Sequence, residues 1–226
     1  MNFIDLGLPS GTCWGGCNIL AKWANLSGAF LSYRTLTDPD AVEDSHIYSL
    51  GPVNKLTGYP SIKLIPVKDM FRMMRDLAYC VPTQEQMTEL VSSCTWKKEI
   101  YGIVWGFRAT SRYNHKSIFF PSFHLFPNHI VQKMSLVQST YDDHRITGRD
   151  RFYSILDCES LAIKSGRSCC QYLTRSTDSH FAPLGWSGGV MALTVEGDTV
   201  KATAKVTPVS QDAWLPIRPV INHKRP

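Results

Sequence analysis

Cysteine and histidine are the residue types in this sequence that could act as nucleophiles or hold a transition metal. The chain has seven of each, and the odd number of cysteines leaves at least one free or bonded between chains. Cys13 and Cys17 are spaced C-x-x-x-C, and Cys169 is followed directly by Cys170. Neither spacing is the C-x-x-C of a zinc ribbon or a thioredoxin-like site. One interpretation is a zinc site built from these four thiols. The interpretation we favour is small, buried, reduced side chains in a protein made in a reducing cytoplasm.

Other catalytic patterns are not found in the sequence. The histidines are scattered without the H-E-x-x-H spacing of a zinc protease, and there is no G-x-S-x-G elbow or phosphate-binding loop. A cysteine and a histidine that meet only in the folded chain stay open as an alternative. We expect a protein that is not an enzyme and that uses no cofactor.

The segment "RSTDSHFAPLGWSGG" at 175–189 has the composition of a binding loop. It is polar and glycine-rich, and its two aromatic rings suit sugar rings and protein hot spots alike. The charged and polar residues could supply hydrogen bonds to hydroxyl groups. An ordinary loop whose aromatic rings pack inward is the alternative. The candidate ligand-binding residues are Arg175, Asp178, His180, Phe181 and Trp186.

The composition indicates a globular protein with a weak positive bias. The chain has 226 residues, 43% of them hydrophobic, with 24 basic and 19 acidic residues, for a net charge of +5. Such a charge favours encounter with acidic surfaces such as nucleic acid or anionic polysaccharide. The basic residues are scattered apart from the tail at 223–225, so we expect no nucleic-acid partner. No apolar run has the roughly 18 to 20 residues that a membrane span needs, so we expect no membrane insertion.

The elements that must position these residues point to an α+β fold. Helical spacing of Met70, Phe71, Met74 and Leu77 predicts one helix from Val67, and a capping box at Thr83 and Gln86 begins a second over 81–94. Residues 3–19 suggest a short hairpin, and 21–66 look irregular. Strands are predicted at 103–110, at 116–121 and at the chain's end, 214–221. A hairpin is predicted over 189–206, with a two-residue turn at Gly197 and Asp198. Four tryptophans are expected in the core, namely Trp14, Trp96, Trp105 and Trp214.

Several segments resemble the Fibrobacter succinogenes major paralogous domain family, which belongs to the wider C-type lectin-like group. "DLGLPSGTCWGGCN" is similar to the family's opening phrase, and "VPTQEQMTELVSSCTW" to its "MPT-x-x-E-x-x-E-L-x-x-x-C-x-W" helix. The helix match is carried by Pro82, Thr83, Glu89, Leu90, Cys94 and Trp96. Shorter matches are "SIFFP" at 117–121, "YLTRST" at 172–177 and "IRPV" at 217–220.

The resemblance implies an architecture for the whole chain. It implies one C-type lectin-like domain over 1–226, with an enlarged insertion at about 122–171. In such folds the N- and C-terminal strands pair, which would place "FIDLGL" beside "LPIRPV" and tie down a strand next to the terminus. Two departures concern the binding surface: Leu173 stands where the family has Trp, and "PSFHLF" replaces "PAAGYR".

Calcium-dependent sugar binding is disfavoured by the motifs present. C-type lectins that use calcium carry E-P-N and W-N-D, because calcium needs roughly six to eight oxygen ligands. Here "FPNH" at 126–129 has Phe126 in the acidic position, and no W-N-D follows. Asp142 and Asp143 are the remaining acidic pair, and a surface turn explains them.

The resemblance and the chain's start together predict a phage protein. Bacterial members of the family are exported, whereas Met1 here precedes no secretory leader, unless one was removed. We therefore expect a fibre, tail or capsid-decorating virion protein, assembled in the host cytoplasm and displayed on the virion surface. It would bind a host glycan or protein without calcium, as a homo-oligomer. The alternatives are a purely architectural protein that binds other virion subunits, and a secreted or surface-bound bacterial adhesin.

Overall fold

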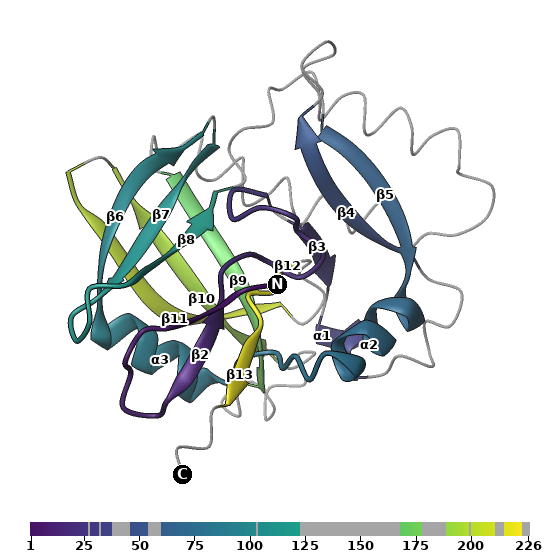
Figure 1. Cartoon of the computed structure of the whole chain (residues 1–226), viewed down its shortest axis with the longest axis horizontal. Helices are drawn as coiled ribbons and strands as arrows, with labels where there is room; N and C mark the ends of the chain where they lie inside the picture. The colour runs from purple at the N-terminus through teal and green to yellow at the C-terminus, as the bar shows by residue number, and fades with distance from the viewer. Residues whose placement is uncertain are drawn as a thin grey trace.

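The computed structural model is an α+β arrangement of short helices and several small antiparallel sheets (Figure 1). It describes residues 1–26, 28–31, 33–37, 46–53, 60–102, 104–122, 168–177, 189–198, 200–210 and 215–222. In the described part of the chain, no helix has both the length and the hydropathy to span a membrane.

The two predicted helices are confirmed. α2 (Val67–Asp76) buries Met70 and Met74, but Leu77 follows its last turn and is 50% exposed, so it does not extend the apolar face. α3 (Gln84–Ser93) begins with the predicted capping box, in which the Thr83 and Gln86 side chains each bond the other's backbone N–H. It ends one residue earlier than expected, because Cys94 is extended and opens a strand.

The two chain ends meet in one sheet, although not as direct neighbours. Its order is β1 (Phe3–Asp5), β2 (Thr12–Gly15) and β13 (Val220–Asn222). The predicted N-terminal hairpin supplies β1 and β2, and β2 lies between β1 and the C-terminal strand. The expected pairing of the terminal segments is therefore confirmed in that they share one sheet, with the partner strand being β2 rather than β1. The hydrogen bonds of the C-terminal strand go to the second arm of the hairpin.

The C-terminal segment is divided between two sheets. β12 (Leu215–Pro216) pairs with β3 (Gly28–Leu31), and only the chain from Val220 pairs with β2. Between them Ile217 and Pro219 accept backbone hydrogen bonds from Ile19 and Gly15. The predicted single strand over 214–221 is thus two strands joined by an extended stretch.

The prediction that 21–66 is irregular is wrong. This region contains β3, α1 (Tyr33–Thr37), β4 (His46–Val53) and β5 (Pro60–Pro66). The last two form a ribbon that stands on the right in Figure 1, above α2. Prolines at both ends of β5, together with Gly51 and Pro52 in β4, hid the strand pattern, because both residue types are depleted in strands.

Two further three-stranded sheets make the other half of the molecule. β6 (Cys94–Tyr101), β7 (Val104–Ser111) and β8 (Ser117–Pro121) form one; the last two were predicted and β6 was missed. β9 (Ser168–Thr177), β10 (Gly189–Gly197) and β11 (Ala202–Ser210) form the other. The β10–β11 hairpin is confirmed, but its connection spans 198–201 rather than two residues, because Gly197 pairs with Ala202.

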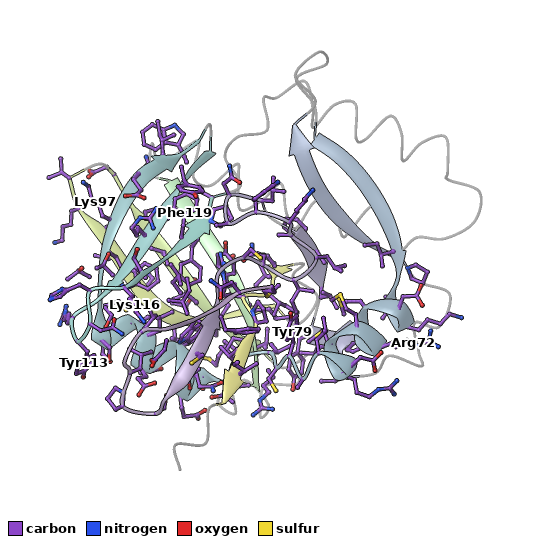
Figure 2. All side chains as sticks on the ribbon, in the orientation of Figure 1. Arg72, Tyr79, Lys97, Tyr113, Lys116 and Phe119 are labelled. Atoms are coloured by element: carbon purple, nitrogen blue, oxygen red, sulfur yellow. The ribbon has the colours of Figure 1, made fainter. Side chains whose placement is uncertain are left out.

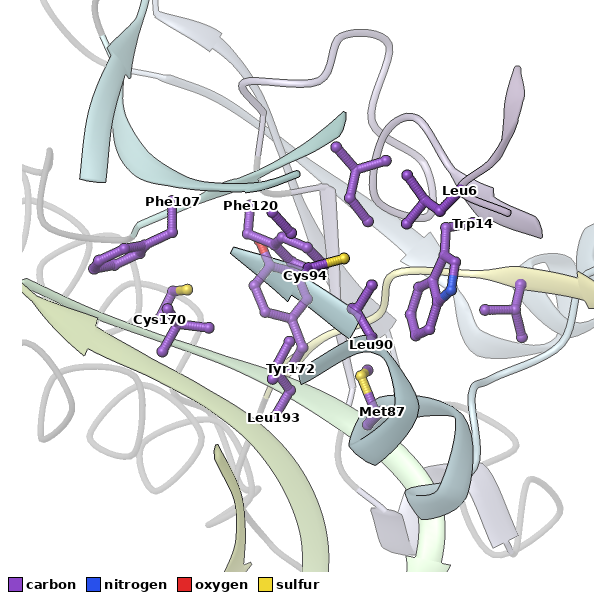
Figure 3. Close-up of a cluster of buried hydrophobic side chains, with 14 of the residues drawn as sticks. Leu6, Trp14, Met87, Leu90, Cys94, Phe107, Phe120, Cys170, Tyr172 and Leu193 are labelled. Carbon is purple, nitrogen blue, oxygen red and sulfur yellow. The ribbon is translucent and has the colours of Figure 1, made fainter. Parts of the chain in front are cut away.

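The sheet β9–β10–β11 separates two hydrophobic clusters. Tyr172 and Leu193 face the cluster that contains α3 and Trp14 (Figure 3). Leu173 and Ala192, one residue along each strand, face the cluster that contains α2 and Phe30. Because successive strand residues point to opposite faces, one sheet serves both cores.

The tryptophans divide between core and surface. Trp14 is fully buried, as predicted, whereas Trp96 and Trp105 are half-buried. Trp214 lies outside the described residues.

Candidate functional site

The sequence-predicted binding segment is described only in part. Arg175 is an exposed residue of β9, and its backbone N–H donates to Pro82 O over 3.0 Å. The next residue, Ser176, accepts from the Gln84 backbone N–H over 2.9 Å, so the end of β9 lies against the first turn of α3. Asp178, His180, Phe181 and Trp186 lie outside the described residues.

Electrostatics at this junction are mild. The pKa of Glu85 is lowered, first by its own backbone N–H, then by the Thr83 side chain and the nearby Arg175. The helix N-terminus favours the charged carboxylate in the same sense. The Glu85 carboxylate is therefore a nearby opposite charge for Arg175.

The five thiols that the structure describes form no disulfide bonds, and most of them are protected by burial. Cys13, Cys94 and Cys170 are buried, and Cys17 and Cys80 are half-buried. Burial raises the pKa of the Cys13 and Cys17 thiols, and raises that of Cys94 to about 11. Since the thiolate is the nucleophile, these three groups are held in the unreactive form at neutral pH.

The four-thiol zinc interpretation involves Cys169, whose side chain lies outside the described ones. Within the described ranges, no three His, Cys, Asp or Glu side chains gather in a group that could hold a metal ion. The segments 126–129 and 142–143, which we weighed for calcium, lie outside these ranges.

The two longest resemblance motifs are in direct contact with each other. The Glu89 carboxylate of α3 accepts hydrogen bonds from the Ser10 backbone N–H and hydroxyl, over 2.8 and 2.6 Å. The Gln86 side-chain amide donates to the Thr12 hydroxyl over 3.2 Å. These motif residues join the opening hairpin to α3.

The closing motif "IRPV" supplies a buried cation. The Arg218 guanidinium is fully buried and donates to two backbone oxygens, those of Gly15 and Phe119. Its carbon lies 4.9 Å from the Phe120 ring centroid and 5.9 Å from that of Tyr172, at cation–π distances. Burial lowers the pKa of Arg218 and raises that of Tyr172. The Arg218 guanidinium thus connects β2, β8 and β9, and because it is fully buried a large ligand cannot reach it.

Two exposed aromatic residues and an exposed isoleucine lie at the joined end of β6 and β7, which projects at the upper left of Figure 1. We call Trp23, Ile100 and Tyr101 the aromatic rim; they are 57%, 52% and 46% exposed. The Asn25 side-chain amide, in the loop that carries Trp23, donates to Tyr101 O over 3.4 Å. This hydrogen bond holds two segments far apart in sequence side by side.

Cations accompany the aromatic rings at this end of the sheet. Lys22 Nζ lies 5.6 Å from the Trp23 ring centroid, and Lys98 Nζ lies 5.0 Å from that of Trp105. Arg108 lies 5.7 Å from the Tyr101 ring. An exposed ring with a nearby cation can stack on a sugar face while hydrogen bonds go to its hydroxyls.

Neither the family models nor the curated proteins and solved structures contain a significant match to this chain. The family resemblance therefore rests on the motif residues themselves.

The rim residues were missed by sequence reasoning for a physical reason. Trp23 lies in a region taken as irregular, and "KEIYGI" at 98–103 lacks the alternation of a half-buried strand. A signal was present: bulky residues at 100 and 101 directly precede Gly102, whose φ of +67° marks a turn. Large apolar side chains at a hairpin turn have little core to enter, so they remain at the surface.

Proposed function

We propose that this chain is a non-enzymatic recognition domain of a phage virion that binds a host cell-surface glycan or protein without calcium. The observation that carries the proposal is the aromatic rim. Trp and Tyr are among the residues most enriched in binding hot spots, and here the two segments that carry them are joined by the hydrogen bond from Asn25 to the Tyr101 backbone oxygen.

The sequence resemblance supports the same reading. It suggests a C-type lectin-like domain, and an arrangement with both termini in one sheet and helices against small antiparallel sheets suits such a fold. The motif residues Ser10 and Glu89 join the opening hairpin to α3, and Arg218 is buried, which leaves the surface loops free to vary in ligand. We propose a fibre, tail or capsid-decorating location, where repeated copies would add avidity to weak single sites.

The resembled family is abundant in gut Bacteroidetes and their phages, so the test is binding of the purified protein to intact cells of these bacteria, with and without a calcium chelator. We expect binding that the chelator leaves unchanged and that Trp23→Ala and Tyr101→Ala each weaken by at least about 30-fold, which corresponds to the roughly 2 kcal/mol or more that truncating a hot spot costs. Leu77→Ala is the matched control, since Leu77 is similarly exposed but lies after α2. Because all three sites are exposed, we expect each substitution to change the free energy of unfolding by less than about 0.5 kcal/mol.

Each other outcome counts against part of the proposal. Loss of binding on adding the chelator would overturn the calcium-free mechanism. Loss in Trp186→Ala but not in the rim variants would move the site to 175–189. Folded protein that binds no strain, yet binds isolated virion subunits, would replace recognition with the architectural role.

A further inference from the structure

One sheet of this protein carries an excess of positive charge. Residues 94–121, which form β6, β7 and β8, contain five basic residues and one acidic residue. Their formal net charge of +4 compares with +5 for the whole chain. Within this sheet, basic residues therefore outnumber acidic ones five to one.

Strand register places these cations in two groups on the sheet. Lys97 and Arg108 are directly opposite each other on the outer face, which faces away from the core. Arg112 and Lys116 lie in the turn that joins β7 to β8, at the other end of the sheet, and both are exposed. We call these four residues the basic face. Figure 2 shows Lys97 and Lys116 on the same side of the molecule, with Arg72 at the opposite end.

Little negative charge opposes the basic face. Glu99 is the sheet's one acidic residue, and its carboxylate pairs with Arg108. Among the described residues, Lys97, Arg112 and Lys116 have no ion-pair partner. Unpaired cations on one face create a local positive potential that favours an acidic ligand.

Hydroxyl groups lie between the two groups of cations. Thr95 pairs with Thr110, and Thr110 pairs with Ser117, so three hydroxyl-bearing residues cross the outer face in one row. The aromatic rim begins where this face ends, because Tyr101 lies on the same side of β6 as Lys97 and its ring is 5.5 Å from that of Phe119. The hydroxyl row, the Lys97–Arg108 pair and the Tyr101 ring thus follow one another along the outer face. Arg112 and Lys116 extend the positive charge past the end of that face where the turn lies.

We propose that the basic face, continued by the aromatic rim, binds an acidic polysaccharide. The inference rests on the recognition function proposed above and names its ligand class: carboxylate or phosphate groups on the cations, and sugar hydroxyls on the central row. Single-stranded nucleic acid is the less favoured ligand. Its phosphates come at about one per 3.4 Å and are met by a continuous basic groove, whereas here the cations are separated by uncharged residues.

The test compares charge reversals at two places that change the net charge equally. Lys97→Glu/Lys116→Glu alters the basic face, and Lys68→Glu/Arg72→Glu alters exposed residues of α2. Binding is measured to alginate as an acidic polymer, dextran as a neutral polymer and oligothymidylate as a nucleic acid. Circular dichroism confirms that each variant is folded.

We expect the unaltered protein to bind alginate more tightly than dextran, with an affinity that falls as salt is raised. The basic-face variant should lose about tenfold in affinity, and the α2 variant should lose less than about threefold. Equal losses in the two variants would assign the effect to net charge and overturn the site. Tighter binding to oligothymidylate than to alginate would overturn the ligand class.

Failure of this inference is distinguishable from failure of the proposed function. Rim-dependent binding to cells with no preference for alginate over dextran overturns the acidic ligand alone. No binding to cells or to either polysaccharide overturns both.

Discussion

At the scale of single residues, Arg218 is a charge enclosed by backbone oxygens and aromatic rings. No carboxylate from the described residues pairs with it, and its Nε has no hydrogen-bond partner. Burying a charge in this way is costly, and the two carbonyl acceptors and two rings offset that cost. The guanidinium suits the position because its planar fork reaches Gly15 O and Phe119 O at once.

Replacing this side chain tests that role. Arg218→Met keeps the volume but leaves two buried carbonyl oxygens without a donor, at about 1–3 kcal/mol each. We expect Arg218→Met to lower the free energy of unfolding by about 2–5 kcal/mol, and Arg218→Lys to recover only part of the loss because one ammonium cannot bridge both oxygens. Urea unfolding measures both. A methionine variant as stable as the parent would contradict this account of the buried cation.

At the scale of elements, the β6–β7–β8 sheet depends on a close approach at Gly106. A Cβ there would meet the Phe119 ring and the Phe120 backbone oxygen. The ring over Gly106 also stacks on Tyr101, so this glycine helps to set the position of the rim. A glycine in a strand interior is accepted here because an aromatic ring covers it.

The corresponding prediction is that Gly106→Ala destabilises the protein by about 2 kcal/mol, as overpacking does when the obstructing atom is backbone. Thermal or urea unfolding measures it, with Thr95→Ala on the exposed face of β6 as the control. Equal free energies of unfolding for Gly106→Ala and Thr95→Ala would contradict the close packing at Gly106.

How much of these elements the sequence predicts depends on how local their signals are. The helix at α3 was found from its capping box and the β10–β11 hairpin from its alternating residues, because each signal lies within one short segment. β4 and β5 were missed because prolines and glycine interrupt them. The division of 214–221 between two sheets depends on β2 and β3, and nothing within "WLPIRPVI" specifies those partners.

At the scale of the whole molecule, the sheet β9–β10–β11 joins two hydrophobic clusters, and the sheet β6–β7–β8 carries a net positive charge. Tyr172 and Leu173 are neighbours in sequence but belong to different clusters. The candidate surface likewise combines a loop at 22–25 with β6, β7 and their turns. The sequence predicts the residue types of such a surface but not their assembly, which requires the strand register.

The location of the ligand surface is the central claim, and hydrogen–deuterium exchange tests it most directly. Exchange would be followed with and without surface polysaccharide purified from a strain that the protein binds. We predict that adding the polysaccharide slows exchange at 22–26 and across 95–116, and that it leaves exchange in α2 unchanged. Protection confined to 175–189, or unchanged exchange throughout the chain, would contradict the account.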